Sequence, residues 1–344
     1  MKQKKMTFDK TKKVLIAGGG LAGLSLANVL KHQGVPYQVY ERDAADLDRS
    51  QGYSLSLYFC LWTLKSAMDP VKYATLGSIC AVDPENPRKS SFGLIDGNTG
   101  ECKAIMEGPP QVDVFRVNRR RFRDWLLDGI DVQHDKQVES YKVTENGVEV
   151  TFTDGTTDHG SVLIGADGVN SRVCEQLLGP EEFARVTVHN PLNVMAGSYW
   201  IDEEYRKEIA GRFSPAHFIG TAADSEDANF TTCLFGSLMD VDHSRDKPYQ
   251  MLWSVSCNHN EAPLETDAKR VQQAKKWVRK AQFHKSLSRL IEDSPDDTKV
   301  YTIRIRERSP PAFLDTYRGP VILIGDAAHA MTQYRGEGMV LKRE

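Results

Sequence analysis

Three mainly apolar runs stand out along the chain because no charged side chain interrupts them. They cover residues 14–17, 161–164 and 321–324, and each leads directly into a glycine-containing turn. Short continuous apolar runs of this kind are typical of strands that are buried on both faces of a parallel sheet. The pattern therefore predicts three buried parallel strands, each ending at a turn.

The first run opens a β-α-β unit of about 30 residues. Residues 21–30 favour a helix, Gly34 ends that helix, and residues 37–41 form the next predicted strand. Beyond this unit, four segments have the alternation or the composition of strands: 111–117, 231–238, 250–256 and 300–306. Two segments have helical spacing: 119–127 and 267–292. Asn146-Gly147 predicts the turn of a hairpin over 142–150.

The overall charge argues against a nucleic-acid partner. The 344 residues carry 44 Lys and Arg against 47 Asp and Glu, a formal net charge of −3. A chain with this balance has no basic field that would hold DNA or an anionic membrane surface. The length allows one large domain or about two of average size.

The cysteines and the N-terminal region bear on metal content and location. The six cysteines are scattered without zinc-ligand spacing, so no metal site is expected, and single cysteines suit a reducing compartment. The uncharged run 14–30 contains several glycines and is shorter than the roughly 20 apolar residues of a membrane span. The basic residues before it lack the features of a signal peptide. We therefore expect a cytoplasmic chain without a membrane span.

Gly18, Gly20 and Gly23 fit the pattern G-x-G-x-x-G between a predicted strand and a predicted helix. The first glycine of this pattern forms the tight turn, the second lets a pyrophosphate approach the backbone, and the third lets helix and strand pack closely. Free N–H groups and the helix dipole then favour the phosphates. Glu41, at the next strand end, is placed to accept hydrogen bonds from ribose hydroxyls. The alternative is a glycine-rich turn with a solvated glutamate.

The pattern predicts a dinucleotide but does not identify it. A carboxylate at Glu41 repels a 2′-phosphate, which disfavours NADP at this site and leaves FAD or NAD. The other two strand ends carry Asp167 and Asp326. Ligands of open α/β sheets lie beyond the carboxyl ends of the strands, so all three ends are expected to line one crevice. Capping of a helix N-terminus is the alternative role for both aspartates.

Five motifs carry a resemblance to one family. Gly-Ala-Asp-Gly at 165–168, with Ser171 and Arg172, and Gly-Asp-Ala-Ala-His at 325–329 are similar to the second and third fingerprints of group A flavin monooxygenases, the family of para-hydroxybenzoate hydroxylase. Residues 117–119 resemble its V-x-R helix start, and residues 49–52 resemble its R-x-x-G segment. Together with the N-terminal glycines, the resemblance covers nearly the whole chain.

The resemblance implies an α/β fold, with a Rossmann-like FAD-binding domain and an inserted β-rich substrate domain. The implied parts are 1–80 (FAD-binding), 81–110 (a contribution to the substrate sheet), 111–185 (FAD-binding), 186–305 (substrate domain) and 306–344 (FAD-binding). It also implies that FAD stays bound while NAD(P)H visits as a transient co-substrate. The residues implied to contact FAD are Gly18, Gly20, Gly23, Glu41, Arg49, Gly52, Arg119, Asp167, Asp326 and Gly338.

The implied roles differ along the cofactor. The three N-terminal glycines would hold the pyrophosphate, Glu41 the adenosine ribose, and Asp326 the ribityl chain. Asp167 and Gly168 would also serve the passage of NAD(P)H, whereas His329 is expected to be structural. No catalytic side chain is implied, because the cofactor carries the hard step while the protein orients it and excludes water.

The function implied by the resemblance is monooxygenation of a small molecule. The chain would use NAD(P)H and O2 to hydroxylate or epoxidise an aromatic or polyketide-like substrate. Aromatic residues of the β-rich middle are candidates for the substrate wall, with ordinary sheet core as the alternative: Trp200, Phe213, Phe218, Phe230, Phe235 and Trp253. The competing functions are a related flavin oxidoreductase, a catalytically weak or inactive FAD-binding paralogue, and an NAD-linked dehydrogenase.

Two positions depart from the pattern of the family. Gln333 stands where the family usually has proline after its histidine, and the chain ends at Glu344, six residues after Gly338. Family members continue into further helices, so a truncated chain with weak retention of FAD is expected. Oligomeric state, substrate identity and the choice between NADH and NADPH have no signal in the sequence.

Overall fold

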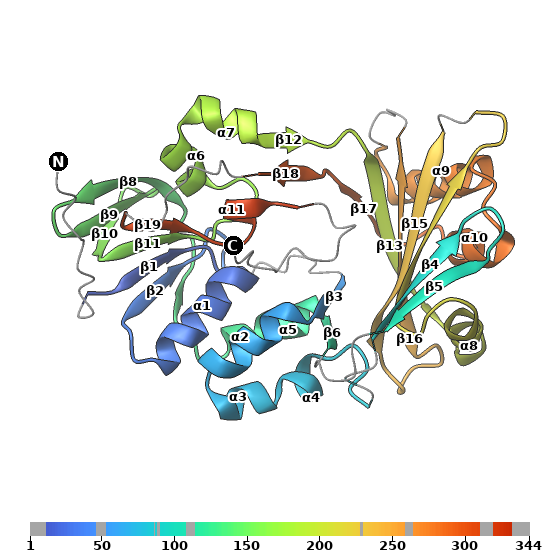
Figure 1. Cartoon of the computed structure of the whole chain (residues 1–344), viewed down its shortest axis with the longest axis horizontal. Coiled ribbons are helices and arrows are strands. Elements are labelled where there is room, and N and C mark those ends of the chain that lie inside the picture. Colours follow the sequence, from blue (N-terminus) through green and yellow to red (C-terminus); the bar gives the residue numbers. More distant parts are fainter. Residues whose placement is uncertain are drawn as a thin grey trace.

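The structure, a computed structural model, describes residues 12–45, 53–85, 87, 90–107, 114–227, 230–258, 264–309 and 319–331. These residues form two bodies that lie side by side, each built on its own sheet (Figure 1). Separate clusters of buried apolar side chains fill the two bodies.

The first body contains a five-stranded sheet in which every neighbouring pair of strands is parallel. The strand order is β19 (Val321–Leu323), β11 (Val162–Gly165), β1 (Val14–Ala17), β2 (Tyr37–Tyr40) and β7 (Val132–Gln133). The three apolar runs are therefore neighbouring strands of one sheet, as predicted. Because they are parallel, their carboxyl ends lie at the same edge.

Both faces of the parallel sheet are covered, which explains why its strands are continuously apolar. Val14 and Ile16 pack on the helical face, whereas Leu15 and Ala17 pack on the opposite face. The helical side holds α1 (Leu21–His32), α2 (Phe59–Ala67), α3 (Pro70–Ala74), α4 (Leu76–Cys80) and α5 (Arg119–Leu127). The opposite side holds β8 (Val138–Thr144), β9 (Gly147–Phe152), β10 (Thr157–Gly160), α6 (Arg172–Leu178) and α7 (Pro180–Val186).

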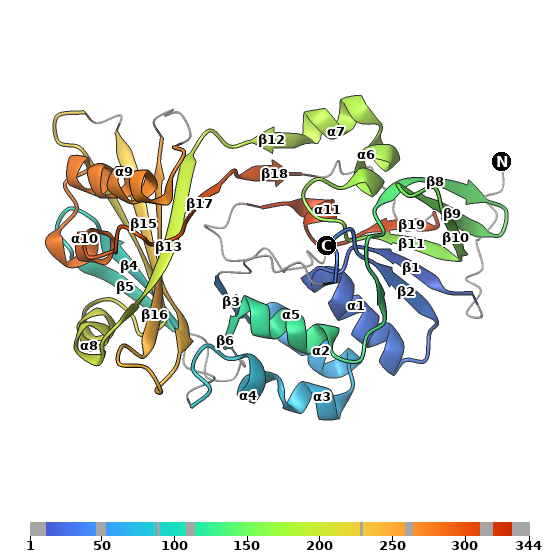
Figure 2. The same cartoon turned by 180° about the vertical axis from the view of Figure 1, so that it is seen from behind.

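The second body is a seven-stranded sheet with helices packed on one of its faces, which is plain from behind (Figure 2). The strand order is β17 (Val300–Ile303), β13 (Asn193–Ile201), β16 (Tyr249–Cys257), β15 (Thr231–Val241), β14 (His217–Ala223), β4 (Ser91–Asp96) and β5 (Cys102–Glu107). The packed helices are α8 (Glu203–Arg212), α9 (Asp267–Lys280) and α10 (Lys285–Glu292). A Rossmann-like domain with a β-rich second domain is thus confirmed, whereas the exact five-part division stays a prediction.

One predicted helix is wrong in extent. Residues 267–292 form α9 and α10 instead of one continuous helix. The chain turns at Gln282, whose φ of +54° is incompatible with a right-handed helix. Phe283 is buried against the sheet, and His284 begins α10 by accepting a hydrogen bond from the Ser286 N–H. Burial of the aromatic ring at the turn therefore overrides the helical spacing.

A two-stranded ribbon lies between the two bodies. Strand β3 (Ser54–Leu57) pairs antiparallel with β6 (Phe115–Asn118). Leu57 and Val117 face the core of the first body. On the other face of the ribbon, the Ser54 hydroxyl donates to the Leu238 carbonyl of β15 at 2.8 Å. The ribbon thus presents an apolar face to one body and a polar face to the other.

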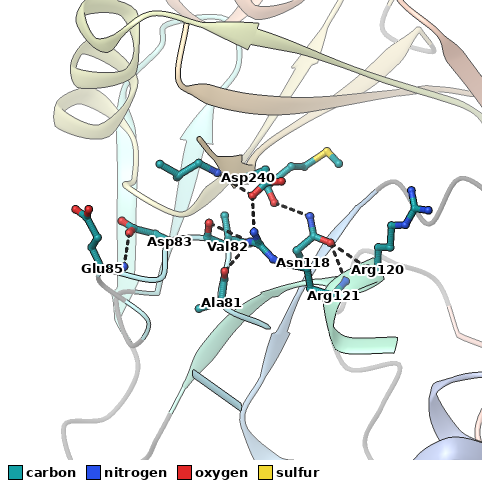
Figure 3. A network of polar contacts seen from close by, with 10 residues as sticks. Ala81, Val82, Asp83, Glu85, Asn118, Arg120, Arg121 and Asp240 are labelled. Carbon is teal, nitrogen blue, oxygen red and sulfur yellow. Dashed lines mark hydrogen bonds and ion pairs between the residues drawn. The ribbon is translucent and has the colours of Figure 1, made fainter. Parts of the chain in front are cut away.

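An ion pair next to the ribbon connects the bodies further (Figure 3). Arg121 lies 2.9 Å from Asp240 of β15, and its guanidinium also donates to the carbonyl of Ala81 at 2.6 Å. Asn118 donates to the Met239 carbonyl at 3.3 Å. A second connection pairs β12 (Thr187–His189) with β18 (Arg306–Arg308), and β19 is followed by α11 (Asp326–His329). Among the helices described, none is both long and apolar enough to span a membrane.

Candidate functional site

The glycine-rich turn after β1 depends on close backbone contacts at two of its glycines. Gly18 has a φ of +114°, and a Cβ there would lie 2.2 Å from the carbonyl oxygen of Ala166, just beyond β11. A Cβ at Gly23 would lie 2.0 Å from the carbonyl oxygen of Gly18. The first and third glycines of the pattern are therefore required for packing of the turn itself.

Gly20 differs from its neighbours because no atom lies within 4 Å of the place its Cβ would take. Its φ of −82° and ψ of −177° are ordinary extended backbone. Gly20 is also the N-cap of α1, and no side chain caps that helix end. Uncapped N–H groups beside open space are the arrangement that binds phosphate at a helix N-terminus.

Glu41, directly after β2, lies beside the same turn. Its Oε2 accepts a hydrogen bond from the Gly19 N–H at 2.8 Å, and its Oε1 accepts one from the Asp43 N–H at 3.0 Å. These bonds fix the carboxylate, and each oxygen keeps lone pairs for further donors. The geometry fits a carboxylate that accepts hydrogen bonds from ribose hydroxyls.

Asp167, beyond β11, has its carboxylate committed to a helix. Its Oδ1 accepts from the Ser171 hydroxyl at 2.5 Å, and its Oδ2 accepts from the N–H groups of Arg172 and Val173 at 2.9 and 3.2 Å. The side chain thus supports the N-terminus of α6, which favours the capping alternative for this residue. The backbone beside it still contributes to the site, because Ala166 lies against Gly18.

The third strand end meets the start of α1. Gly325 has a φ of +59°, and a Cβ there would lie 2.8 Å from the Cβ of Ala22. Asp326 follows, and its side chain does not cap α11. The residue is exposed, but partial desolvation of its carboxyl group by the surrounding protein raises the pKa of Asp326. The charges of His329 and Arg119 act in the opposite direction and lower that pKa. The structure therefore brings all three strand ends together, and Asp326 lies near Arg119 and His329.

Arg119, at the start of α5, reaches this site from the ribbon. Its guanidinium lies 5.2 Å from the ring centre of Tyr53, and its backbone N–H donates to the Tyr53 carbonyl at 3.1 Å. Its Nε is buried and has no hydrogen-bond partner within the described structure. A buried donor without an acceptor is costly, so the geometry fits an Arg119 that donates to a cofactor.

Sequence reasoning missed Arg308, in β18, which connects two loops of the site by hydrogen bonds. Its side chain is 2% exposed and donates to the carbonyls of Val169 at 2.6 Å and Ala327 at 2.8 Å. It thereby ties the loop after β11 to α11. Arg308 lies two residues beyond the predicted strand 300–306. Its partners are main-chain carbonyls and the Thr187 hydroxyl, all from other segments of the chain, so no sequence pattern reveals them.

Four positions singled out in the sequence lie outside the described residues. They are Arg49, Gly52, Gln333 and Gly338. Their expected roles stay predictions.

The six aromatic candidates fall into two groups. Phe213, Phe218, Phe230 and Trp253 are buried in the core between the seven-stranded sheet and its helices. Trp200 stacks with Arg245, whose guanidinium lies 4.2 Å from the ring centre. Phe235 alone among these six belongs to a cluster on the opposite face of the sheet, with Ala196, Met239, Leu252 and Ile303. Ordinary sheet core is therefore the role of most of them.

The face that carries Phe235 is the one turned toward the first body. The contacts of the ribbon with Ser237 and Met239 of β15 place that body on this face. Ser237 and Met239 alternate with Leu234 and Leu238, which belong to the helix-covered core. An apolar wall with interspersed serines thus stands opposite the strand ends of the parallel sheet.

The fold and these contacts define a dinucleotide-binding protein with a second, β-rich domain that faces the nucleotide site. A sequence model of the FAD binding domain family matches residues 11–56 and 110–341. The chain therefore belongs to this family of FAD-binding proteins.

Similar proteins make the class more specific. The chain is 35% identical over 335 residues to the FAD-dependent monooxygenase dbaB of Emericella nidulans, covering 94% of this chain and 82% of that protein. It is 30% identical over 346 residues to the FAD-dependent monooxygenase thnD of Trichoderma harzianum, covering 94% and 78%. The fold is that of Klebsiella pneumoniae HpxO complexed with FAD and uric acid, at a TM-score of 0.71 and 20% identity over 96% of this chain and 77% of that one.

The predicted class is confirmed: the chain is a flavoprotein of the FAD-dependent monooxygenases, with FAD as its cofactor. NAD(P)H as co-substrate is typical of this class. The comparisons do not favour the dehydrogenase alternative, and they do not favour the inactive paralogue. As a monooxygenase it acts on a small molecule with O2.

Proposed function

We propose that this chain uses NAD(P)H and O2 to hydroxylate or epoxidise a small aromatic or polyketide-like substrate. The observation that supports this most is the open space at Gly20, on the uncapped N-terminus of α1. It lies beside the ends of β11 and β19, and the apolar wall of the seven-stranded sheet stands opposite. A binding site for an anionic dinucleotide thus adjoins a wall suited to flat apolar molecules.

The proposed contacts with FAD follow from the geometry of each strand end. Gly20 and the N–H groups of α1 would receive the pyrophosphate, while Gly18 and Gly23 shape the turn. Glu41 would accept hydrogen bonds from the adenosine ribose, and Asp326 would lie on the ribityl side. Arg119 would donate its unpaired Nε–H. For Arg49, Gly52 and Gly338 the resemblance alone supports a contact, and for Asp167 we propose that the backbone contributes and not the carboxylate.

When bound, FAD supplies the redox and oxygen-transfer chemistry, and the protein supplies orientation and a dry environment. Met239 and Leu252 are at most 8% exposed, so the wall they belong to keeps water away from the reacting centre. No side chain needs to act as a nucleophile. Arg308 holds the loop after β11 and helix α11, which follows β19, in fixed positions relative to each other.

Three further parts of the proposal concern the whole chain. We propose that residues 1–80, 111–185 and 306–344 form the FAD-binding part, and that 81–110 and 186–305 form the substrate part. Both β4 and β5, from the segment 81–110, lie in the seven-stranded sheet, which supports this division. A cytoplasmic location and the absence of a nucleic-acid partner also belong to the proposal, supported by the balanced charge and the single scattered cysteines.

The test begins with the visible spectrum of the purified chain. NADPH and NADH consumption and O2 uptake are then measured together, with and without a panel of aromatic and polyketide-like phenols. The proposal expects a yellow protein whose NAD(P)H oxidation rises with at least one compound, and a product that carries isotope-labelled oxygen from O2. Label arriving from water instead of O2, or a yellow protein that no compound stimulates, would count against it.

A further inference from the structure

Arg116, in β6, is a buried cation that has no counter-ion among the described residues. It is 8% exposed, and its guanidinium donates to the hydroxyls of Ser56 at 3.1 Å, Ser54 at 2.8 Å and Ser237 at 2.6 Å. Its Nε is buried without an acceptor, and no carboxylate pairs with it in the described part of the chain. Burial alone lowers the pKa of this guanidinium to about 9. Such a charge is costly unless an anion offsets it.

Arg116 lines a small cavity where the ribbon meets the segment after α4, helix α8 and the turn before β14. The cavity has a volume of about 60 Å³ and is lined by Val82, Asp83, Pro87, Arg116, Arg206, Pro215, Ala216 and Leu238. A single water needs only about 10–15 Å³ of such space. A carboxylate or the oxygen of a phenolate therefore fits, whereas a whole aromatic ring does not. The cavity therefore suits the polar end of a larger molecule.

The second arginine of the cavity has a different electrostatic environment. Arg206 is 9% exposed, and its Nη1 is buried without an acceptor in the part of the chain that the structure describes. Burial lowers the pKa of Arg206, but the charges of Asp83 and Glu203 act to raise it. Two carboxylates thus act on Arg206, whereas no carboxylate of the described residues lies within ion-pair distance of Arg116. The acceptors that the described structure offers Arg116 are hydroxyl groups.

The surface next to Arg116 is aromatic. His217 of β14 is the register partner of Ser237, which receives a hydrogen bond from Arg116. The ring centre of His217 lies 5.1 Å from that of Phe92 and 6.0 Å from that of Phe235. Its Nδ1 is buried and lacks a partner among the described residues. A planar molecule on Phe92 and Phe235 would cover His217, and Arg116 would lie beside it at Ser237.

We propose that Arg116 binds an anionic oxygen of the substrate, a carboxylate or a phenolate, while the ring packs on Phe92 and Phe235. This inference rests on the proposed function, since it names the substrate class of the same site. A charge-assisted hydrogen bond at one end of a flat molecule fixes its orientation in the plane of the wall. Arg116 would thereby select which ring carbon is presented for oxygenation.

The test uses the FAD-loaded protein and two matched probe pairs. The carboxylate probe 2-naphthoate is compared with the neutral 2-naphthamide, and 4-nitrophenolate with 4-nitroanisole in mildly alkaline buffer. Binding is followed by changes in flavin absorbance. We expect at least one anion to bind about tenfold or more tightly than its neutral match, as one hydrogen bond to a charged group provides. The pair that shows the preference identifies which oxygen is bound.

Variants then assign the preference to one arginine. Arg116→Met is expected to bind the anion and its neutral match equally, whereas Arg206→Met keeps the preference. FAD content and thermal unfolding establish that each variant folds. If Arg116→Met does not fold, Arg116→Lys, which keeps the charge but loses the Nε–H, is expected to reduce the preference. In the wild-type protein, bromide should weaken binding of the anion and leave the neutral probe unaffected.

The outcomes separate this inference from the proposed function. NAD(P)H oxidation by the wild-type protein, measured with the compound panel that tests the proposed function, reports on the flavoenzyme alone. If that oxidation is present but both probe pairs bind without an anion preference, the role of Arg116 is refuted and the proposed function stands. A preference that survives in folded Arg116→Met, or disappears in Arg206→Met, also refutes it. If the FAD-loaded protein does not oxidise NAD(P)H, the proposed function fails first.

Discussion

Replacing Gly20 by alanine separates the folding of the glycine-rich turn from its binding of FAD. The new methyl group meets no atom within 4 Å, and the backbone at Gly20 is compatible with alanine. A compatible Gly→Ala change lowers the entropy of the unfolded chain and stabilises a protein by about 0.4–1 kcal/mol. The protein without cofactor should therefore unfold at the same urea concentration or slightly higher.

The same methyl group would project into the space where the pyrophosphate is proposed to lie. It would push a phosphate oxygen off the N–H groups of α1, at the cost of about one charge-assisted hydrogen bond, or roughly 2–3 kcal/mol. That loss corresponds to FAD binding that is weaker by roughly 30- to 150-fold. Titration of the cofactor-free protein with FAD, followed by quenching of flavin fluorescence, measures it.

Two other glycines provide the controls. Gly211, near the end of α8, also has open space at its Cβ, so Gly211→Ala should stabilise by up to about 1 kcal/mol without changing FAD affinity. Gly18→Ala should destabilise by about 2 kcal/mol or more, because its Cβ would lie 2.2 Å from the Ala166 oxygen. A folded Gly20→Ala protein that binds FAD as tightly as the wild type would refute the proposed position of the pyrophosphate.

Three further predictions concern the strand ends. Glu41→Gln should keep the fold and bind FAD about tenfold more weakly, because the hydrogen bonds from ribose lose their charge assistance; unchanged affinity would contradict the ribose contact. Arg308→Met should destabilise the protein by about 3 kcal/mol in urea unfolding, because two buried carbonyls lose a charged donor. Folding raises the pKa of Asp326, because burial disfavours its charged form. The contribution of this carboxyl group to stability is therefore complete below the unfolded pKa of about 3.9 and is lost as the pH rises through the folded pKa. Asp326→Asn should therefore gain stability relative to wild type at neutral pH but not at acid pH, while retaining less FAD.

The parallel sheet could be predicted from the sequence because its signal is local and strong. The strands around Leu15, Leu163 and Ile322 are continuously apolar, since each is buried on both faces. Glycines that follow such strands have a positive φ and close contacts that alanine would violate, as at Gly18 and Gly325. Both the apolar strand and the glycine after it are visible in consecutive residues of the sequence. The three strand ends therefore lie at one edge of the sheet, as predicted.

The break between α9 and α10 could not be predicted in the same way. Helical spacing continues from Ala274 to Leu287, and the interruption depends on Phe283 being buried against the seven-stranded sheet. That contact is made with residues distant in sequence. The spacing of apolar residues along the chain therefore gives no sign of the break.

Asp167 illustrates a second limit of sequence reasoning. A short acidic side chain between a strand and a helix can cap the helix or bind a cofactor, and both roles need the same position in the chain. The structure distinguishes them through the N–H groups of Arg172 and Val173, which point at its carboxylate. The motif thus locates the loop correctly without identifying which atoms of it face the cofactor.

The two arginines that matter most here, Arg116 and Arg308, share one feature that conceals them in a sequence. Their partners are hydroxyls and main-chain carbonyls from other elements, so the sequence around each arginine does not reveal them. Arg308 has its hydrogen-bond acceptors within the protein, which indicates a structural role for this side chain. Arg116 retains an Nε–H without an acceptor among the described residues, and it lines a small cavity. Because folding alone does not satisfy that charge, a ligand is the most economical explanation of its burial.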